Sequence, residues 1–124
     1  MRAIVLTLAL LSLPAPAAPT DDAAALSALR HPNAVLIDVR SAEEFASGSL
    51  PGARRIGHEE IAEQIATLAP DKSTPIVLYC RSGRRSSIAQ DILQDLGYSN
   101  VSNAGGYEDF KLVLRDAQMP CSTC

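Results

Sequence analysis

Residues 76–93 read IVLYCRSGRRSSIAQDIL and predict a strand, a short loop and a helix in succession. The apolar run 76–79 has the length of a strand, and apolar residues at helical spacing begin after Arg84. Cys80 stands where the apolar run ends, and small or cationic residues follow it. A structural cysteine prefers enclosed apolar surroundings, where its thiol is inert. We therefore expect Cys80 to lie in a polar loop as a reactive thiol.

The rest of the chain alternates strand patterns with helix patterns. The predicted strands cover residues 34–39, 53–56, 76–79 and 98–103, and the predicted helices cover 20–30, 42–47, 58–68, 84–96 and 107–115. The 42–47 helix starts at a capping box and ends at Gly48. The run 34–39 lacks polar alternation, which is typical of a strand buried on both faces. The pattern predicts an α/β domain with a mainly parallel sheet of four or five strands flanked by helices.

Two predicted strands end in polar residues that can form a site. In parallel sheets the ligand crevice lies beyond the carboxyl ends of the strands. Cys80 follows one strand, and Asp38 and Arg40 end another, so we expect all three at the same edge. A carboxylate and a guanidinium ending one buried strand more often hold loops than touch substrate. We therefore assign Asp38 and Arg40 a supporting role.

The residues after Cys80 predict an anion-binding loop. Gly83 permits a tight turn, and the N–H groups of the loop and of the following helix N-terminus point inward. The bound anion can be the thiolate itself, because helix N-termini and cations lower a thiol pKa from ~8.5 to roughly 3.5–7.5. A thiolate is already nucleophilic and requires no general base. The candidate residues are Cys80 as nucleophile, Arg81, Ser82, Gly83, Arg84 and Arg85 as the substrate-binding loop, and Ser86 as a support.

Three motifs resemble the rhodanese family of sulfurtransferases. YCRSGRRS at 79–86 is similar to the family's active loop, Cys-x-x-Gly-x-Arg-Ser. LIDVRSAEEFASGSLPGA at 36–53 and GYSNVSNAGGY at 97–107 are similar to its two other motifs. The motifs occur in family order and span about residues 34–115. The chain looks most like the small, single-domain periplasmic rhodaneses.

The resemblance implies a rhodanese-like three-layer fold and a thiosulfate sulfurtransferase. Cys80 would carry a sulfane sulfur from thiosulfate to a thiol or cyanide as a persulfide, without cofactor or metal. Arg81, Arg84 and Arg85 would attract the dianionic donor. The chain departs from the family at Ser49, where members often have His, and the family's short first strand has no clear counterpart. The Ser49 position lies in a turn, so we expect little functional loss there.

Two other functions remain open. One alternative is a phosphatase or arsenate reductase. Phosphatases that share this fold carry Cys-x5-Arg, with an arginine six residues after the cysteine. Here the sixth residue after Cys80 is Ser86, and the last arginine of the loop is Arg85. The shorter loop favours a sulfane sulfur over phosphate. Non-catalytic rhodanese-like sulfur carriers or binding modules typically lack the cysteine, which is present here. We therefore favour the enzyme.

The N-terminus predicts export. Residues 1–17 have one positive charge, a short apolar run and an Ala15-Pro16-Ala17 cleavage site, as in a signal peptide. We expect cleavage there, a periplasmic location without stable membrane association, and a rhodanese domain over 20–118. The formal net charge of −3 argues against a nucleic-acid partner.

The last residues, 119–124, form a predicted flexible tail with a C-x-x-C motif. In an oxidising compartment Cys121 and Cys124 can form a small-ring disulfide. Alternatively, one of the two thiols reaches Cys80 and accepts its sulfur or bonds to it. A metal site is a further possibility, although C-x-x-C is only half a ligand set. We favour the disulfide, because neighbours in sequence have the higher effective concentration.

Overall fold

Four parallel strands form the centre of the structure, a computed structural model that describes residues 20–118. The strands are β1 Val35–Asp38, β2 Arg54–Arg55, β3 Ile76–Cys80 and β4 Val101–Gly106, in the spatial order β2-β1-β3-β4. Val35 pairs with Ile76, and Ile76 pairs in turn with Val101. The predicted α/β fold with a parallel sheet is confirmed.

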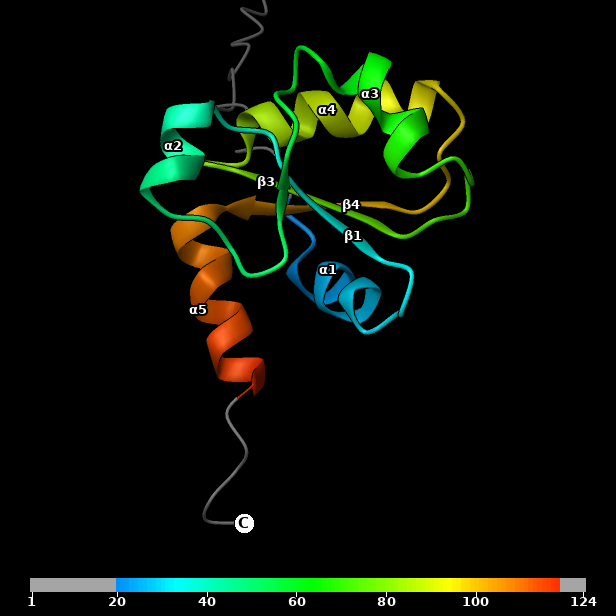
Figure 1. The fold of residues 1–124 in the computed structure, drawn as a ribbon. Helices are drawn as coiled ribbons and strands as arrows, with labels where there is room; N and C mark the ends of the chain where they lie inside the picture. Colours follow the sequence, from blue (N-terminus) through cyan, green and yellow to red (C-terminus); the bar gives the residue numbers. More distant parts are fainter. Residues whose placement is uncertain (1–19, 119–124) are drawn as a thin grey trace, which may run out of the picture.

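Helices cover both faces of the sheet (Figure 1). One face carries α3 Ile61–Leu68 and α4 Arg84–Asp95, and the other carries α1 Asp22–Leu29 and α5 Tyr107–Gln118. The short helix α2 Ala42–Ser47 lies beside the carboxyl ends of the strands. Its predicted capping box is present, with the Ser41 hydroxyl accepting from the Glu44 N–H.

Alternate residues of the central strands build two apolar cores. Because neighbouring side chains of a strand point to opposite faces, Ile37 and Leu78 pack toward α3 and α4. Leu36 and Val77 pack toward α1 and α5. Cys80 belongs to the first core and therefore faces the N-terminal turn of α4.

Several element boundaries differ from the prediction, and the starts of β4 and α3 have a clear physical reason. Strand β4 was expected over 98–103 but spans Val101–Gly106, because Tyr98 and Ser99 turn back onto the α3–β3 connection. The Tyr98 hydroxyl donates to the Ala69 carbonyl at 2.7 Å, and the Ser99 N–H donates to the Lys72 carbonyl at 3.0 Å. Similarly, α3 begins at Ile61 rather than at position 58, since residues 58–60 form a turn.

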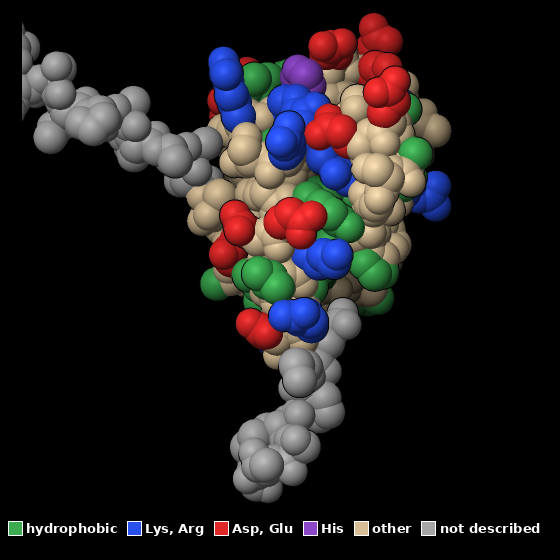
Figure 2. Space-filling model, turned by 90° about the vertical axis from the view of Figure 1, so that its left-hand side faces the viewer, with side chains coloured by type: hydrophobic (Ala, Val, Ile, Leu, Met, Phe, Trp, Pro, Cys, Tyr) green, Lys and Arg blue, Asp and Glu red, His purple; other side chains and the backbone are tan. Residues whose placement is uncertain are grey.

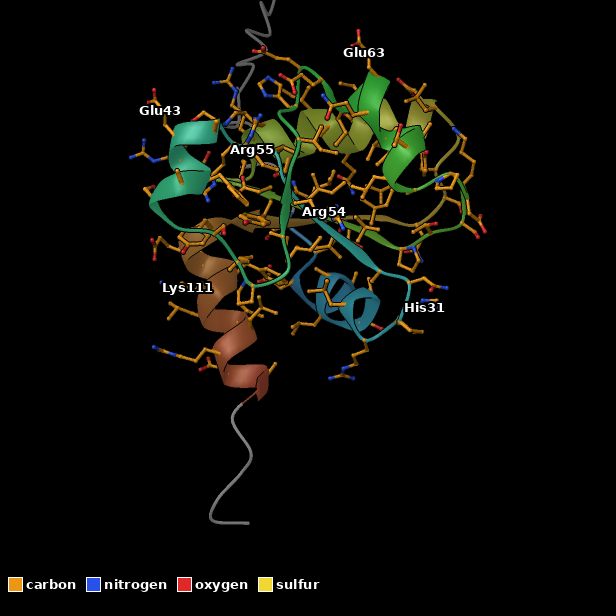
Figure 3. The ribbon with its side chains drawn as sticks, in the orientation of Figure 1. His31, Glu43, Arg54, Arg55, Glu63 and Lys111 are labelled. Atoms are coloured by element: carbon orange, nitrogen blue, oxygen red, sulfur yellow. The ribbon has the colours of Figure 1, made fainter. Side chains whose placement is uncertain are left out.

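The two edges of the sheet differ. Strand β2 is an edge of two residues, Arg54 and Arg55 (Figure 3), and a short charged edge resists pairing with other chains. At the β4 edge, the Asp21 N–H donates to the Asn103 carbonyl at 2.8 Å. Within residues 20–118 the sheet has four strands.

The predicted signal peptide and C-x-x-C tail lie outside the described residues. Among residues 20–118, no helix has the length and apolar character needed to cross a membrane.

Candidate active site

Cys80 is the last residue of β3 and is completely buried. The expectation that it lies in a polar loop is wrong, because the chain after it folds back over the sulfur. The Gly83 N–H donates to the Cys80 Sγ at 2.9 Å, and the Ser86 Oγ lies 3.5 Å from the same atom. The thiol is therefore enclosed by polar groups rather than by apolar side chains alone.

Two opposing effects act on the Cys80 thiol. Burial raises its pKa, because a charge is costly away from water. Hydrogen bonds from the Ser86 side chain and from the backbones of Ser86, Ser82 and Gly83 act in the other direction. Together these hydrogen bonds prevail and lower the pKa of Cys80 below its ordinary value. The arrangement stabilises the thiolate form relative to that of an ordinary cysteine, in a site closed to solvent.

Glycines allow the loop to fold against β4. Gly83 is the N-cap of α4 and has φ +91°, in the left-handed region that favours glycine. A Cβ on Gly106 would lie 2.7 Å from the Arg81 carbonyl oxygen, a contact that side chains do not tolerate. The Ala-Gly-Gly stretch at 104–106 therefore has a physical reason, namely close approach of two backbones.

The three arginines of the loop are not equivalent. Arg81 and Arg84 are exposed to solvent. The Arg85 guanidinium instead binds both oxygens of Glu44, at 2.8 and 3.0 Å. Hydrogen bonds to Glu44 raise the pKa of Arg85, and its charge also interacts with Cys80. Of the three arginines expected to attract the donor, two are exposed and the third is paired with a carboxylate.

Asp38 and Arg40 form a buried ion pair beside the site. The Arg40 Nη2 lies 2.7 Å from the Asp38 Oδ2 and donates to the Gly48 carbonyl at 2.6 Å. The guanidinium also lies 4.5 Å from the centre of the Tyr107 ring. The pair therefore ties the end of β1 to the turn after α2 and to the start of α5, which is the geometry of a support.

The face at the carboxyl ends of the strands carries mixed charge (Figure 2). Lys and Arg side chains gather there beside a His, with Asp and Glu side chains close by. One hollow is lined by Arg40, Glu44, Gly48, Arg81 and Tyr107. A second is lined by Arg40, Arg55, His58 and Arg85. Arg40 borders both hollows and lies between them.

Sequence reasoning missed two residues near the thiol. Glu44 was recognised only as part of a capping box, and its bond to Arg85 bridges 41 positions of sequence. Asn103 was recognised only inside a motif, yet it is buried and accepts a hydrogen bond from Ser86 at 2.7 Å. The predicted strand 98–103 also contains Ser99, Asn100 and Ser102, so no local pattern singled out Asn103.

No group of three or more His, Cys, Asp or Glu within residues 20–118 could hold a metal ion. Cys121 and Cys124 lie outside that range, so the readings of the C-x-x-C motif stay as predictions.

Comparison with known proteins agrees with the motif resemblance. The model of the family described as "Rhodanese-like domain" matches residues 22–112. Thiosulfate sulfurtransferase PspE of Escherichia coli is 42% identical over 76 residues, covering 61% of this chain and 73% of that protein. Thiosulfate sulfurtransferase GlpE of Pseudomonas savastanoi is 37% identical over 90 residues, covering 72% and 83%. A solved structure titled "rhodanese with anions from E. coli" has a TM-score of 0.60 and 42% identity, covering 61% of this chain and 89% of that chain.

Proposed function

The chain belongs to the rhodanese-like domain family, and on this premise we propose that it is a thiosulfate sulfurtransferase whose nucleophile is Cys80. The observation that carries the proposal is the hydrogen-bonded, buried thiol at the carboxyl end of β3. Relatives named thiosulfate sulfurtransferase support the choice of donor.

In the first half-reaction, the Cys80 thiolate attacks the outer sulfur of thiosulfate. The new Sγ–S bond forms as the sulfur–sulfur bond of thiosulfate breaks, and sulfite leaves with the electron pair. The negative charge then lies on the outer sulfur of a persulfide. Inward-pointing N–H groups of the 81–85 loop stabilise this charge, as an oxyanion hole does. The Gly83 N–H, 2.9 Å from Sγ, is the donor placed to stabilise the Cys80 thiolate before attack and again when the acceptor has removed the sulfur.

In the second half-reaction, a thiolate or cyanide attacks the outer sulfur of the persulfide. The Sγ–S bond breaks, and Cys80 recovers its electron pair as a thiolate. Because each half-reaction releases a product before the next substrate reacts, the kinetics should be ping-pong. No cofactor takes part in either step.

The exposed Arg81 and Arg84 steer the dianionic donor toward the face that holds Cys80. Arg85, bound to Glu44, holds the loop in place. We further propose that residues 1–17 are a cleaved signal peptide and that the domain over 20–118 works in a bacterial periplasm.

Intact mass spectrometry tests the proposal. A chain with Cys121→Ser and Cys124→Ser, which keeps Cys80 alone, is treated with thiosulfate. We expect a gain of about 32 Da, one sulfur atom, as covalent catalysis requires. The further substitution Cys80→Ser should abolish both the mass gain and the release of sulfite.

Other outcomes distinguish the remaining functions. Phosphate-ester or arsenate turnover without a mass gain would favour a phosphatase or arsenate reductase. A persulfide that forms but passes its sulfur to neither thiols nor cyanide would favour a sulfur carrier. Sulfite release that is unchanged in the Cys80→Ser variant would remove Cys80 from the reaction.

A further inference from the structure

Three buried side chains from three elements meet behind the thiol. Asn103 of β4, Ser86 of α4 and Cys80 of β3 are each fully enclosed. The Ser86 Oγ lies 2.7 Å from the Asn103 Oδ1 and 3.5 Å from the Cys80 Sγ. Ser86 therefore stands between an amide oxygen and the proposed nucleophile.

Backbone groups fix the orientation of the Asn103 amide. Its Oδ1 accepts the Gly105 N–H at 2.9 Å, and its Nδ2 donates to the Gly83 carbonyl at 3.1 Å. An N–H can only donate and a carbonyl can only accept, so a flipped amide would lose both bonds. The oxygen therefore faces Ser86, and the Ser86 hydroxyl must be the donor in that contact.

A serine hydroxyl has one proton to donate. While the proton points to Asn103, Ser86 offers only lone pairs to the sulfur, and these suit a protonated thiol. A thiolate requires the opposite arrangement, in which the Ser86 O–H turns toward Sγ. The Asn103 oxygen then keeps its bond from Gly105 and is not left unpaired.

We propose that Asn103 is a positioning residue that acts through Ser86 and Gly83, holding the Ser86 proton while Cys80 Sγ is uncharged and releasing it when Sγ becomes a thiolate. The inference rests on the proposed function for its place in the reaction. Sγ is negative before attack on the donor and again when the acceptor removes the sulfur. In the persulfide the charge lies on the outer sulfur, and the Ser86 proton returns to Asn103.

The same amide also anchors the loop. Its Nδ2 holds the Gly83 carbonyl, and the N–H of that residue is the 2.9 Å donor to Sγ. Asn103 thus controls two of the groups that contact the sulfur. The other charged groups around the loop are Arg85 of α4 with its partner Glu44 of α2, the exposed Arg81 and Arg84, and the Asp38–Arg40 pair at the end of β1. Substitutions at Ser86 and Asn103 leave all of these charges in place.

A double-mutant cycle on the thiol pKa tests the proposal. The rate of alkylation by iodoacetamide is measured against pH for Ser86→Ala, Asn103→Ala and the double variant, all in the Cys121→Ser, Cys124→Ser background. At a pH below the midpoint, Ser86→Ala should slow alkylation about threefold when Asn103 is present. In the Asn103→Ala background, Ser86→Ala should slow alkylation about tenfold. There the Ser86 hydroxyl donates to the thiolate without first giving up its hydrogen bond to Asn103, so its loss has the larger effect. Equal effects in the two backgrounds would overturn the proposal.

A second measurement covers the case in which Asn103→Ala does not fold. In isotope-labelled protein, the NMR signals of the Asn103 side-chain amide and the Gly105 N–H are followed through the thiol titration. Both signals should shift at the midpoint of the thiol titration. In Ser86→Ala the shifts should be at least about threefold smaller, because this variant has no hydroxyl to turn from Asn103 toward the sulfur. Equal shifts in both proteins would refute the proposed reorientation of the Ser86 hydroxyl.

Neither measurement uses a sulfur donor, so the outcomes are separable from those of the proposed function. Coupling between Ser86 and Asn103 without a thiosulfate-induced mass gain would support the proposed role of Asn103 and contradict the sulfurtransferase function. A mass gain without coupling would support the sulfurtransferase function and contradict the proposed role of Asn103.

Discussion

Glu44 of α2 and Arg85 of α4 form a bidentate ion pair that joins the segment after β1 to the loop after β3. The Nη1–Oε1 distance is 2.8 Å and the Nη2–Oε2 distance is 3.0 Å. Hydrogen bonds from Arg85, opposed by partial burial and aided by Ser41, lower the pKa of Glu44 to about 2. One carboxylate thus caps α2 and fixes the arginine that closes the proposed catalytic loop.

Replacing Glu44 with Gln should lower kcat for thiosulfate about three- to tenfold without raising KM. The arginine loses its bidentate partner, so the loop is held less firmly, while removal of a negative charge does not repel the dianionic donor. A glutamine still completes a capping box, so α2 should remain intact. The matched control is Glu43→Gln, which removes the same charge from the neighbouring exposed position. A KM that rises with kcat unchanged would place Glu44 in donor binding instead.

The same pair predicts a pH dependence of stability. Because the folded pKa of Glu44 lies below its unfolded value, its stabilising effect is complete above the unfolded pKa of about 4.3 and is lost as pH falls toward 2. The difference in unfolding free energy between the native chain and Glu44→Gln should therefore be constant from pH 6 to 8 and shrink in acid. Urea unfolding at several pH values measures it. A difference that grows in acid would contradict the assignment of the shift to this pair.

Local sequence patterns predicted the helices and strands, but they could not predict contacts between residues far apart in the sequence. The capping box at Ser41, the apolar run 34–39 and the helix after Arg84 are encoded by neighbouring residues, and the structure contains all three. The Glu44–Arg85 bond depends on how α2 and α4 are placed by the sheet, which no spacing rule shows. Burial of Cys80 was missed for a similar reason, because the loop covers the thiol only through its contacts with β4.

Neutralising the exposed arginines should weaken donor capture. Arg81→Gln and Arg84→Gln should each raise the KM for thiosulfate about three- to fivefold, with kcat nearly unchanged, because both cations act at a distance through solvent. The native KM should rise with ionic strength, and the double variant should show a weaker rise. Arg30→Gln is the control, since Arg30 is exposed and lies between α1 and β1, at the other end of the sheet. Equal KM values in all variants would exclude steering by the loop.

Breaking the buried ion pair should affect stability more than chemistry. Asp38→Asn leaves the Arg40 guanidinium buried without its charge partner, which costs about 3–5 kcal/mol of unfolding free energy. Adding Arg40→Met should recover part of that loss, because no unpaired charge then remains. Urea unfolding measures both effects, and activity is expressed per folded molecule. A large loss of kcat at unchanged stability would make the pair part of the reaction rather than its support.

Gly106 tests whether the loop must touch the end of β4. Its φ lies outside the left-handed region, so a substitution there meets only a limit of space. A Cβ would lie 2.7 Å from the Arg81 carbonyl, and backbone cannot swing aside as the end of a side chain can. Gly106→Ala should therefore displace the loop, cost about 1–3 kcal/mol of stability and lower kcat/KM at least about tenfold.

Gly57→Ala provides the matched control for Gly106→Ala. The nearest atom to its added Cβ is the Arg55 Nη1 at 3.4 Å, the end of a flexible side chain, so stability and activity should change little. Alkylation of Cys80 should slow in Gly106→Ala alone, because the displaced Gly83 N–H no longer reaches the sulfur. If Gly106→Ala lost stability but kept the native alkylation rate and kcat/KM, the packing of the loop on β4 would serve the fold without serving the thiol.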